Sequence, residues 1–487
     1  MKKYEQIKNY LKEVEKITYL NNLVYWELHV NGSKNSKDYL LEVLTELSGK
    51  SFSLTTSEEY GQLLIDLIND EEFNTLSEQE QRYFKLLHER YDNFKKIPVD
   101  FYKEYINNTN KAVTVWEQAK AENNYEKFKP YLAKNIELSK QYYSYISDKD
   151  DLYDVMLEQY ERGMNSKTID KLFNRLKEVL IPLIKEVEQP QIKVEQTYTN
   201  EESLNIARYL LDYIGFDNNR GQLGIYPHGF TQTINHDDVR IAFCSKEGPA
   251  SFVGTIIHEG GHGIFEQNIN KDIYLSNTDN SLGLHESQSR FYENILGRNI
   301  NFWIPIYDEI SKMLKLDITI EEFIKALNNV HCGLIRINAD QLTYALHIII
   351  RYEIERDLFN DKITVEQLPE IWNSKMKQYL NVIPTKDSEG LMQDVHWAEG
   401  LFGYFPTYLI GNIYDGMFLE AIEKELGPVD EILKKGEIKK ITQFLNKHIH
   451  EYGGIYTYEE IMNNVCHKEI SPEPIINYYQ KKYQRKK

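Results

Sequence analysis

Long amphipathic segments follow one another through the first 185 residues of the chain. In the first segment, Ile7, Leu11, Val14 and Ile17 recur every three or four residues, which places them on one face of a helix. The same pattern predicts helices over 36–48, 57–70, 77–93, 99–122 and 165–188. Glycine and proline are scarce, with 25 and 13 in 487 residues, so few residues interrupt these helices. We therefore predict a mainly α-helical protein, in which residues 1–185 form a scaffold or the wall of a groove.

The pattern changes between residues 186 and 250. The stretch "QIKVEQTY", residues 191–198, alternates apolar and polar side chains as a half-buried strand does. Residues 224–234 and 237–244 are typical of two more short strands with turns between them. We predict a small β-sheet in this region, followed by a second helical part at 251–487. A single domain that includes the whole chain is the simplest organisation.

Charge and cysteine content exclude several classes of partner and location. The formal net charge of −18 argues against nucleic acid or an anionic membrane as the main partner. The sequence contains no run of 18 apolar residues, so no membrane span is expected, and the N-terminal stretch lacks the apolar core of a signal peptide. Cys244, Cys332 and Cys466 are odd in number and far apart, which is typical of a reducing compartment. A cytoplasmic location is expected.

The stretch "TIIHEGGHGIFEQN", residues 255–268, carries the strongest chemical pattern. His258 and His262 are four residues apart and so lie on one face of a helix, where both can bind one metal ion. Glu259 lies beside that face, as the general base does in the HExxH pattern of zinc peptidases. The three glycines at 260, 261 and 263 cost about 1 kcal/mol each in a helix, which close approach by a substrate or a neighbouring helix would explain. The alternative is a pair of ordinary core or surface histidines.

A catalytic zinc site needs a third protein ligand and one open position. Glu286 follows His262 by 24 residues, which leaves room for a turn and a second helix. Glu293 is an alternative third ligand, because it lies seven residues further on nearly the same helix face. We expect His285 to support the ligands and not to bind the metal itself.

Several separated motifs resemble those of the peptidase family M32, the metallocarboxypeptidases of the carboxypeptidase Taq type. The matching motifs are "HEGGH" (258–262), "HESQS" (285–289), "IRINAD" (335–340) and "GLMQDVHW" (390–397), with weaker similarity in "LVYWE" (23–27) and "GYFPTYLIGN" (403–412). Three positions depart from the family pattern: Gly229 replaces proline in "HGF", Ala242 replaces threonine in "DVRIA", and Gln341 stands where an acidic residue is expected.

The resemblance implies a fold, an activity and a cofactor. The fold would be a large helical one with a deep groove, similar to neurolysin-like peptidases of the gluzincin type, with a small sheet beside the metal-binding helix. The activity would be removal of C-terminal residues from peptides with broad specificity, and the protein would be a homodimer. His258, His262 and Glu286 would bind one Zn²⁺ per chain, with Co²⁺ as an alternative ion.

The catalytic roles follow from the motifs and from the chemistry of peptide hydrolysis. Glu259 would take a proton from the attacking water and deliver it to the leaving amine. His396 and Tyr408 are candidates for stabilising the oxyanion, with Tyr404 in reserve. His228 is expected at a strand end near the groove.

A carboxypeptidase also needs a cation for the free carboxylate of its substrate, and arginine suits this role because it binds a carboxylate through two N–H groups. Arg336 is predicted within an apolar helix, where it either binds the substrate or pairs internally with Asp340 four residues on. Arg240 is the second candidate, and Asp238 on the same strand face could neutralise it. Two further residues, Gln393 and Asp394, are expected to orient His396 or a metal-binding histidine, although loop capping is the common role of such a pair.

Two rival functions share the same residues. An endopeptidase or a dipeptidyl carboxypeptidase would have the same metal ligands, and the cation for the terminal carboxylate is the feature that distinguishes them. Cleavage of a blocked C-terminal amide as fast as of the free acid would contradict a carboxypeptidase. A catalytically silent helical protein that retains its metal would not need the base Glu259.

Overall fold

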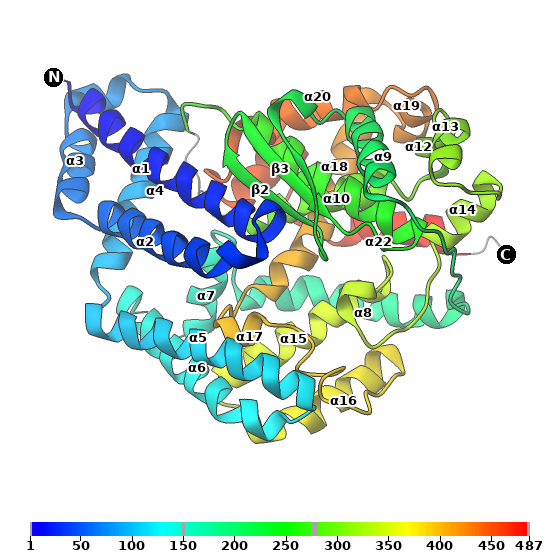
Figure 1. The fold of residues 1–487 in the computed structure, drawn as a ribbon, viewed down its shortest axis with the longest axis horizontal. Helices are drawn as coiled ribbons and strands as arrows, with labels where there is room; N and C mark the ends of the chain where they lie inside the picture. Colours follow the sequence, from blue (N-terminus) through cyan, green and yellow to red (C-terminus); the bar gives the residue numbers. More distant parts are fainter. Residues whose placement is uncertain (1, 149–150, 274–280, 485–487) are drawn as a thin grey trace.

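The computed structural model describes residues 2–148, 151–273 and 281–484, and most of them are helical (Figure 1). The first part contains α1 (Lys3–Trp26), α2 (Lys37–Thr55), α3 (Glu58–Ile68), α4 (Glu78–Lys95), α5 (Val99–Glu122), α6 (Tyr125–Ile146), α7 (Leu152–Tyr160) and α8 (Ser166–Val187). Then follow α9 (Asn200–Ile214), β1 (Leu223–Ile225), β2 (Phe230–Asn235), β3 (Asp238–Phe243), α10 (Pro249–Asn268), α11 (Leu282–Arg290) and the π-helical η5 (Phe291–Leu296). The last part contains α12 (Ile300–Trp303), α13 (Tyr307–Met313), α14 (Ile320–Leu327), the 3₁₀ turn η6 (Arg336–Asn338), α15 (Thr343–Phe359), α16 (Leu368–Leu380), α17 (His396–Glu399), α18 (Phe405–Leu426), α19 (Val429–Lys434), α20 (Lys439–His448), α21 (Tyr458–Ile461) and α22 (Glu473–Tyr483).

The helices predicted in the first 188 residues are confirmed. Each of the five predicted segments overlaps one helix of the structure, namely α2, α3, α4, α5 and α8. The start of α4 has a capping box, in which Ser77 accepts from the backbone of Glu80 and the Glu80 side chain accepts from the backbone of Ser77. The stripe of Ile7, Leu11 and Val14 on α1 is buried, as its spacing predicts.

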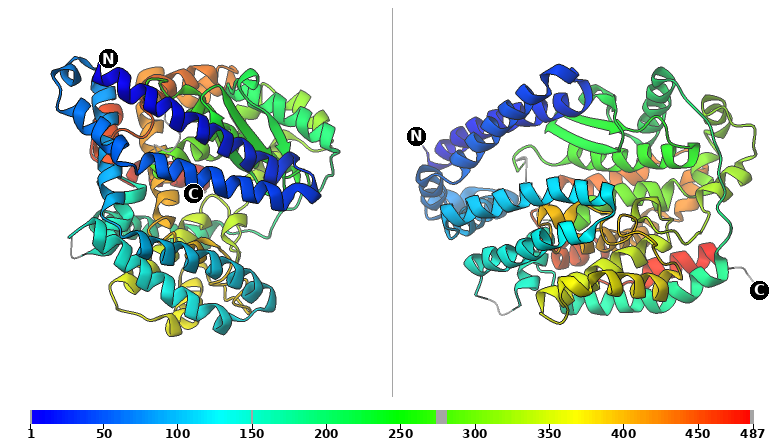
Figure 2. Two further views of the ribbon diagram at one scale, coloured as in Figure 1. Left: turned by 60° about the vertical axis from the view of Figure 1, so that its left-hand side comes forward. Right: turned by 60° about the horizontal axis from the view of Figure 1, so that its bottom comes forward.

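The sheet has three strands in the order β1-β3-β2, with β1 parallel and β2 antiparallel to β3. In Figure 1 and in the left view of Figure 2, the sheet lies in the upper half of the molecule and the pair α5–α6 lies in the lower half. The outer strand β2 packs against α1 and α10. The strand predicted at 237–244 is confirmed as β3. The stretch predicted as one strand at 224–234 is instead divided into the end of β1 and most of β2, with residues 226–229 between them.

The strand predicted at 191–198 is wrong. This stretch has no strand partner among the described residues, and hydrogen bonds to loop and helix-end groups hold it instead. Ile192 donates its backbone N–H to the Asn329 side chain, and the Gln196 and Tyr198 side chains donate to the carbonyls of Lys315 and Leu314. The alternation reflects an extended chain with one face packed on helices and not a place in the sheet.

Arg336 does not lie in a long helix, contrary to the sequence-based expectation. It begins the short turn η6, and α15 starts only at Thr343. Asp340 causes this late start, because its carboxylate accepts from the backbone N–H groups of Leu342 and Thr343 at 2.9 and 3.2 Å and from the Thr343 hydroxyl at 2.6 Å.

The hydrophobic core is continuous through the molecule. Its main cluster runs from Ile7 of α1 to Tyr479 of α22. Both α15 and α18 are buried on nearly every face, which explains why neither helix has a polar side. Among the described residues, no helix combines the length and apolar character needed to cross a lipid bilayer.

Candidate active site

Two close helix contacts position α11 beside α10. A Cβ atom added at Gly261 would lie 2.5 Å from the Gln288 carbonyl oxygen and 2.7 Å from the Ser289 Cα. On the other side of α11, a Cβ added at Gly411 of α18 would lie 3.0 Å from the Gly283 carbonyl oxygen. Both contacts are with backbone, which cannot move aside, so glycine is needed for α11 to fit between α10 and α18. The glycines of "HEGGH" thus admit a neighbouring helix, and those at 260 and 263 face side chains of Leu211, Ile214 and Phe216.

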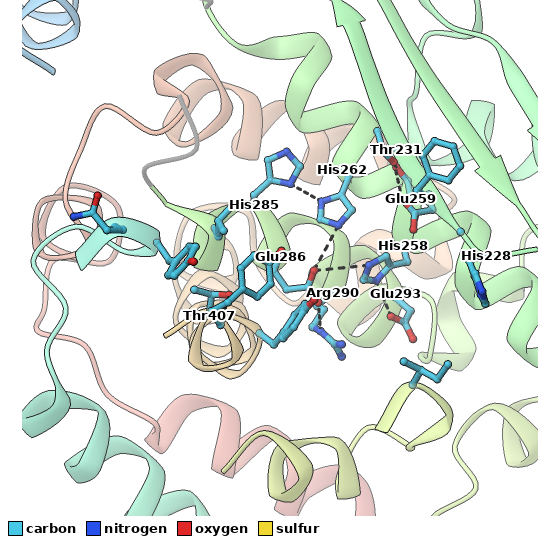
Figure 3. A pocket seen from close by; sticks show the side chains of 18 of the residues that line it. His228, Thr231, His258, Glu259, His262, His285, Glu286, Arg290, Glu293 and Thr407 are labelled. Atoms are coloured by element: carbon cyan, nitrogen blue, oxygen red, sulfur yellow. Dashed lines mark hydrogen bonds and ion pairs between the residues drawn. The ribbon is translucent and has the colours of Figure 1, made fainter. Parts of the chain in front are cut away.

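This packing brings three ligand atoms together (Figure 3). The Oε2 atom of Glu286 lies 3.8 Å from Nε2 of His258 and 3.5 Å from Nε2 of His262. One nitrogen from each imidazole and one carboxylate oxygen all lie within 4.8 Å of one another. Two imidazoles and one carboxylate are a ligand set that suits Zn²⁺, and Co²⁺ accepts the same donors.

Hydrogen bonds at the far ring nitrogens orient both imidazoles. His258 Nδ1 lies 3.0 Å from Glu293 Oε2, and Arg298 donates to the other oxygen of Glu293 at 3.1 Å. His262 Nδ1 lies 2.6 Å from His285 Nδ1, whose Nε2 lies 2.8 Å from Glu266 Oε1. When the Nδ1 atoms of His258 and His262 donate, each Nε2 carries the lone pair that faces Glu286. Glu293, a candidate ligand from the sequence, therefore supports His258, and His285 supports His262.

The electrostatic field at His258 favours a cation, whereas burial and the neighbouring His285 lower the pKa of His262 to about 3 and keep its ring neutral, as a metal ligand must be. Burial opposes a charge on His258, but the carboxylates of Glu286, Glu293 and Glu259 outweigh burial and raise the pKa of His258 to about 9. Burial also opposes the charge of Glu293, yet its bond to His258 and the nearby Arg298 lower its pKa to about 2. The field that favours a proton on His258 equally favours a divalent cation, so the residues present fit a metal ion.

Glu259 is held by the strand beside it. Its side chain is 6% exposed and lines the groove, and the Thr231 hydroxyl lies 2.7 Å from its Oε2 and 3.0 Å from its backbone carbonyl oxygen. Figure 3 shows Thr231 and Glu259 on neighbouring elements, β2 and α10. A Cβ atom added at Gly229 would lie 2.6 Å from the Thr255 methyl carbon and 3.0 Å from Glu259 Oε1. Glycine at this position, where the family has proline, thus lets the start of β2 lie close to Glu259.

A groove with a volume of about 2020 Å³ contains these residues. At one end its lining comes from α1, α2 and α4, and at the other end from α14, η6 and the start of α10. His228, Tyr404 and Tyr408 line the groove, as do all three proposed metal ligands.

Arg336 also lines the groove, but its acidic partner is not the one expected. Two of its nitrogens, Nε and Nη2, lie 3.1 and 3.0 Å from Asp394 Oδ1, and Nη1 donates to the Tyr344 hydroxyl at 3.1 Å. The other oxygen of Asp394 accepts from Nε of Arg351 at 2.7 Å. The predicted internal pair with Asp340 is wrong, because Asp340 faces the start of α15. Asp394 therefore orients Arg336, where the sequence suggested that it would orient a histidine.

His396 lies behind the groove wall, and Tyr408 lies in the wall. The two side chains meet at 3.2 Å between His396 Nε2 and the Tyr408 hydroxyl, and the ring of Tyr404 lies 5.4 Å from each of the other two rings. Gln393 accepts from the Arg336 backbone N–H at 2.8 Å and donates to the carbonyls of Leu334, Glu389 and Gly390. Gln393 thus caps loops, and its bonds do not reach His396.

Arg240 and Asp238 pair with each other. Nη2 of Arg240 lies 2.7 Å from Asp238 Oδ2, and the guanidinium lies 5.7 Å from the ring of Trp26. Neither residue is among those that line the groove. Of the two candidate cations, Arg336 is therefore the one placed to meet a substrate.

The other two departures from the family pattern lie away from the metal ligands. Ala242 on β3 is fully buried in a small apolar cluster with Trp26 and Ile234. Gln341 donates to the Asn294 carbonyl and accepts from Lys482, which ties it to α22.

Three further residues at the site, Arg290, Thr231 and Tyr344, are revealed only by the structure. Nε of Arg290 donates to Glu286 Oε1 at 2.6 Å, and its guanidinium lies 3.7 Å from the ring centre of Tyr344. The spacing of four residues between Glu286 and Arg290 was a signal that could have revealed this pair. Nothing in the sequence links Thr231 to Glu259, because strand and helix meet only in the folded chain.

The arrangement of two imidazoles and a buried glutamate on one helix, with a second carboxylate on the next helix as third ligand, defines a metallopeptidase. Comparison with known proteins identifies the family: the profile of the carboxypeptidase Taq (M32) metallopeptidases matches residues 6–483. This chain therefore belongs to the M32 family and is a metallocarboxypeptidase.

Relatives and solved structures agree with this assignment. Carboxypeptidase 1 of Bacillus subtilis is 36% identical over 485 residues, which cover 97% of this chain and 96% of that protein. Thermostable carboxypeptidase 1 of Pyrococcus furiosus is 31% identical, with 98% of each chain covered. A solved structure of Pyrococcus furiosus carboxypeptidase has a TM-score of 0.93 at 30% identity, with 99% of each chain covered. The fold predicted from the motifs is thus confirmed.

Proposed function

We propose that this metallocarboxypeptidase removes residues one at a time from the free C-terminus of peptides, with Zn²⁺ held by His258, His262 and Glu286. The observation that carries the proposal is the meeting of the three ligand atoms within 4.8 Å, in a groove that also contains Glu259 and Arg336. When bound, Zn²⁺ supplies a Lewis acid that lowers the pKa of water and polarises a carbonyl group.

The residues of the chain would supply proton transfer and orientation. Glu259 takes a proton from the attacking water and gives it to the leaving amine, while Thr231 holds the carboxylate in place. The Tyr408 hydroxyl donates to the oxyanion of the tetrahedral intermediate, and one such donor typically contributes about 3 kcal/mol. His396 lies behind Tyr408 and positions its hydroxyl.

Arg336 would decide which end of a peptide is cleaved. Its guanidinium lines the groove, and Asp394 and Tyr344 hold its orientation. A pre-oriented guanidinium binds a carboxylate strongly because little side-chain freedom is lost on binding. His228 lines the groove near Glu259 and would contact the substrate there. Arg240 and Asp238 would support β2 through their own ion pair and would act on the substrate only through that strand.

The proposal extends to the organisation of the protein. The chain would act as one domain, which is supported by the family match over 6–483 and by the continuous core. We propose a homodimer in the cytoplasm. The homodimer is supported by the resemblance to the family, and the cytoplasmic location is supported by the three separated cysteines.

The test is mass spectrometry of a peptide with a free C-terminus, incubated with the protein in the presence and absence of a chelator. We expect a ladder of products that each lose one C-terminal residue, and we expect the chelator to prevent it. The same peptide with a C-terminal amide should be cleaved far more slowly. Equal cleavage of acid and amide would contradict the role of Arg336 and favour an endopeptidase, and release of residue pairs would indicate a dipeptidyl carboxypeptidase.

A further inference from the structure

A carboxylate at one end of the groove has no cationic partner. Glu247 lines the groove just before α10, and the Thr255 hydroxyl donates to its Oε2 at 3.0 Å. In the part of the chain that the structure describes, no lysine, arginine or histidine nitrogen lies within ion-pair distance of it. The charge of His228 acts on it and favours the ionised form. Burial raises the pKa of Glu247, which reflects a carboxylate that has lost part of its water without gaining a cation.

The other acids at this end of the groove are already satisfied. Glu293 lies between His258 and Arg298, and Asp340 accepts from the backbone and hydroxyl at the start of α15. Arg298 also donates to the Leu327 carbonyl. Glu247 is therefore the group at this end that a positively charged ligand would complement.

The placement of Glu247 relates it to the C-terminal residue of a substrate. Thr255, its hydrogen-bond partner, lies on α10 one turn before His258. A Cβ atom added at Gly254 would lie 3.9 Å from Glu293, which in turn contacts Arg298, and the charge of Asp340 acts on Arg298. The start of α10 and the segment with Arg336 thus lie near one another through Glu293 and Arg298. Figure 3 shows Glu293 beside His258, and His285 on the far side of His262.

The wall around Glu247 has both polar and apolar residues. Gln191, Ser251 and Asn329 line this end together with the apolar Ile192 and Leu327. A substrate whose free carboxylate lies at Arg336 would place its last side chain in this space. Lysine and arginine are long enough for their stems to lie on the apolar residues while the charged group reaches an acid.

We propose that Glu247 selects peptides whose C-terminal residue is lysine or arginine. This inference rests on the proposed function, because it takes Arg336 as the residue that binds the terminal carboxylate. The carboxylate of Glu247 would bind the ammonium or guanidinium group while Thr255 holds it in place.

The test compares two peptides that differ only at the C-terminus, one ending in lysine and one in norleucine, which has a chain of similar length without the charge. We expect kcat/KM to be about tenfold higher for the lysine peptide, since a partly buried ion pair has a value of this order. In E247Q the ratio should fall to near one, and in E247K it should fall below one. The preference of the wild type should also weaken as salt rises from about 0.05 to 0.5 M.

A matched control removes the same charge from the opposite end of the groove. Glu89 on α4 lines that end, where it pairs with Arg162, and E89Q should keep the wild-type ratio. Metal content and thermal unfolding of each variant verify its folding, and the wild-type ratio alone tests the inference if E247Q does not fold. A wild-type ratio near one, or a ratio unchanged in E247Q, would overturn the inference. If neither peptide loses its last residue, the proposed function itself is wrong.

Discussion

The metal-binding region and the carboxylate-binding region of this groove are built in different ways. The first is made of α10, α11 and η5, where His258 and His262, and also Glu286 and Arg290, are related by one turn of a helix. The second has Arg336 in a short turn, and its position depends on Asp394, 58 residues further along the chain. Arg351 contacts the same carboxylate from α15.

This difference implies two kinds of sensitivity to mutation. Helix geometry positions the metal ligands locally, so changes there should alter metal affinity or the chemical step. Arg336 is positioned by an ion-pair network across distant segments, so changes there should alter substrate binding and leave the metal in place. The following experiments test this division, from the largest expected effect to the smallest.

The largest effect is expected from E259Q. The amide cannot accept a proton, so kcat should fall by about 10³- to 10⁴-fold while metal content stays near one ion per chain. Activity assays and elemental analysis measure the two quantities on the same preparation. Normal turnover in this variant would show that Glu259 is not the general base.

In the other region, R336M should lower kcat/KM by about 10²-fold for a peptide with a free carboxylate, mainly through KM. For the corresponding C-terminal amide, the change should be much smaller. D394N should show the same pattern more weakly, because Arg336 keeps its bond to Tyr344. Loss of metal from R336M would show that the two regions are not separable.

The variant E293Q tests whether the hydrogen bond that Glu293 accepts from His258 contributes to metal binding. Glu293 accepts from His258 and Arg298, so the amide should weaken the orientation of the His258 ring. We expect metal affinity to fall by about 10- to 100-fold with the fold retained, as measured by competition with a chelating dye. An unchanged affinity would indicate that α10 positions His258 without help from η5.

T231V tests whether the strand holds the general base. Removal of the hydroxyl that contacts Glu259 should lower kcat by about tenfold with little change in KM, since the substrate is still bound. T231S keeps the hydroxyl and should restore most of the activity. A change in KM alone, or failure of T231S to restore kcat, would assign Thr231 a purely structural role.

The smallest effect on activity is expected from substitution of Glu355 on α15. Its carboxylate accepts from Trp397 Nε1 and from the backbone N–H of Gly403, and these bonds hold the segment that follows Asp394 in place. Burial raises the pKa of Glu355 to about 7 from a normal value of 4.5. Because the folded-state pKa is the higher one, its stabilising contribution is complete below about pH 4.5 and is lost as pH rises through 7.

The E355Q variant isolates this contribution, because glutamine does not titrate. Relative to E355Q, the wild type should lose a few kcal/mol of its free energy of unfolding between about pH 5 and pH 8. Chemical denaturation at several pH values measures it. A difference that is constant with pH would show that Glu355 has the same pKa in the folded and unfolded chains.

Sequence reasoning succeeded where a regular period or a local motif carried the information. The helix stripes of α1 and the HExxH spacing of α10 depend on residues three or four apart, and both were correct. It failed at 191–198, where the alternation had no neighbouring strand to pair with, and at Arg336, whose helix was predicted to start too early. In both places, contacts with distant segments overrode the local pattern.

The amino-acid sequence by itself determined the helical class, the two imidazoles on one face with Glu259 beside them, and the candidates for the third ligand. Only the tertiary structure showed where those candidates lie: Glu286 faces the imidazoles, and Glu293 lies behind His258. It also decided that Arg336 pairs with Asp394 and that Thr231 contacts Glu259. The reason is that helix geometry relates residues within one or two turns, whereas the relation between helices and strands depends on packing of the whole chain.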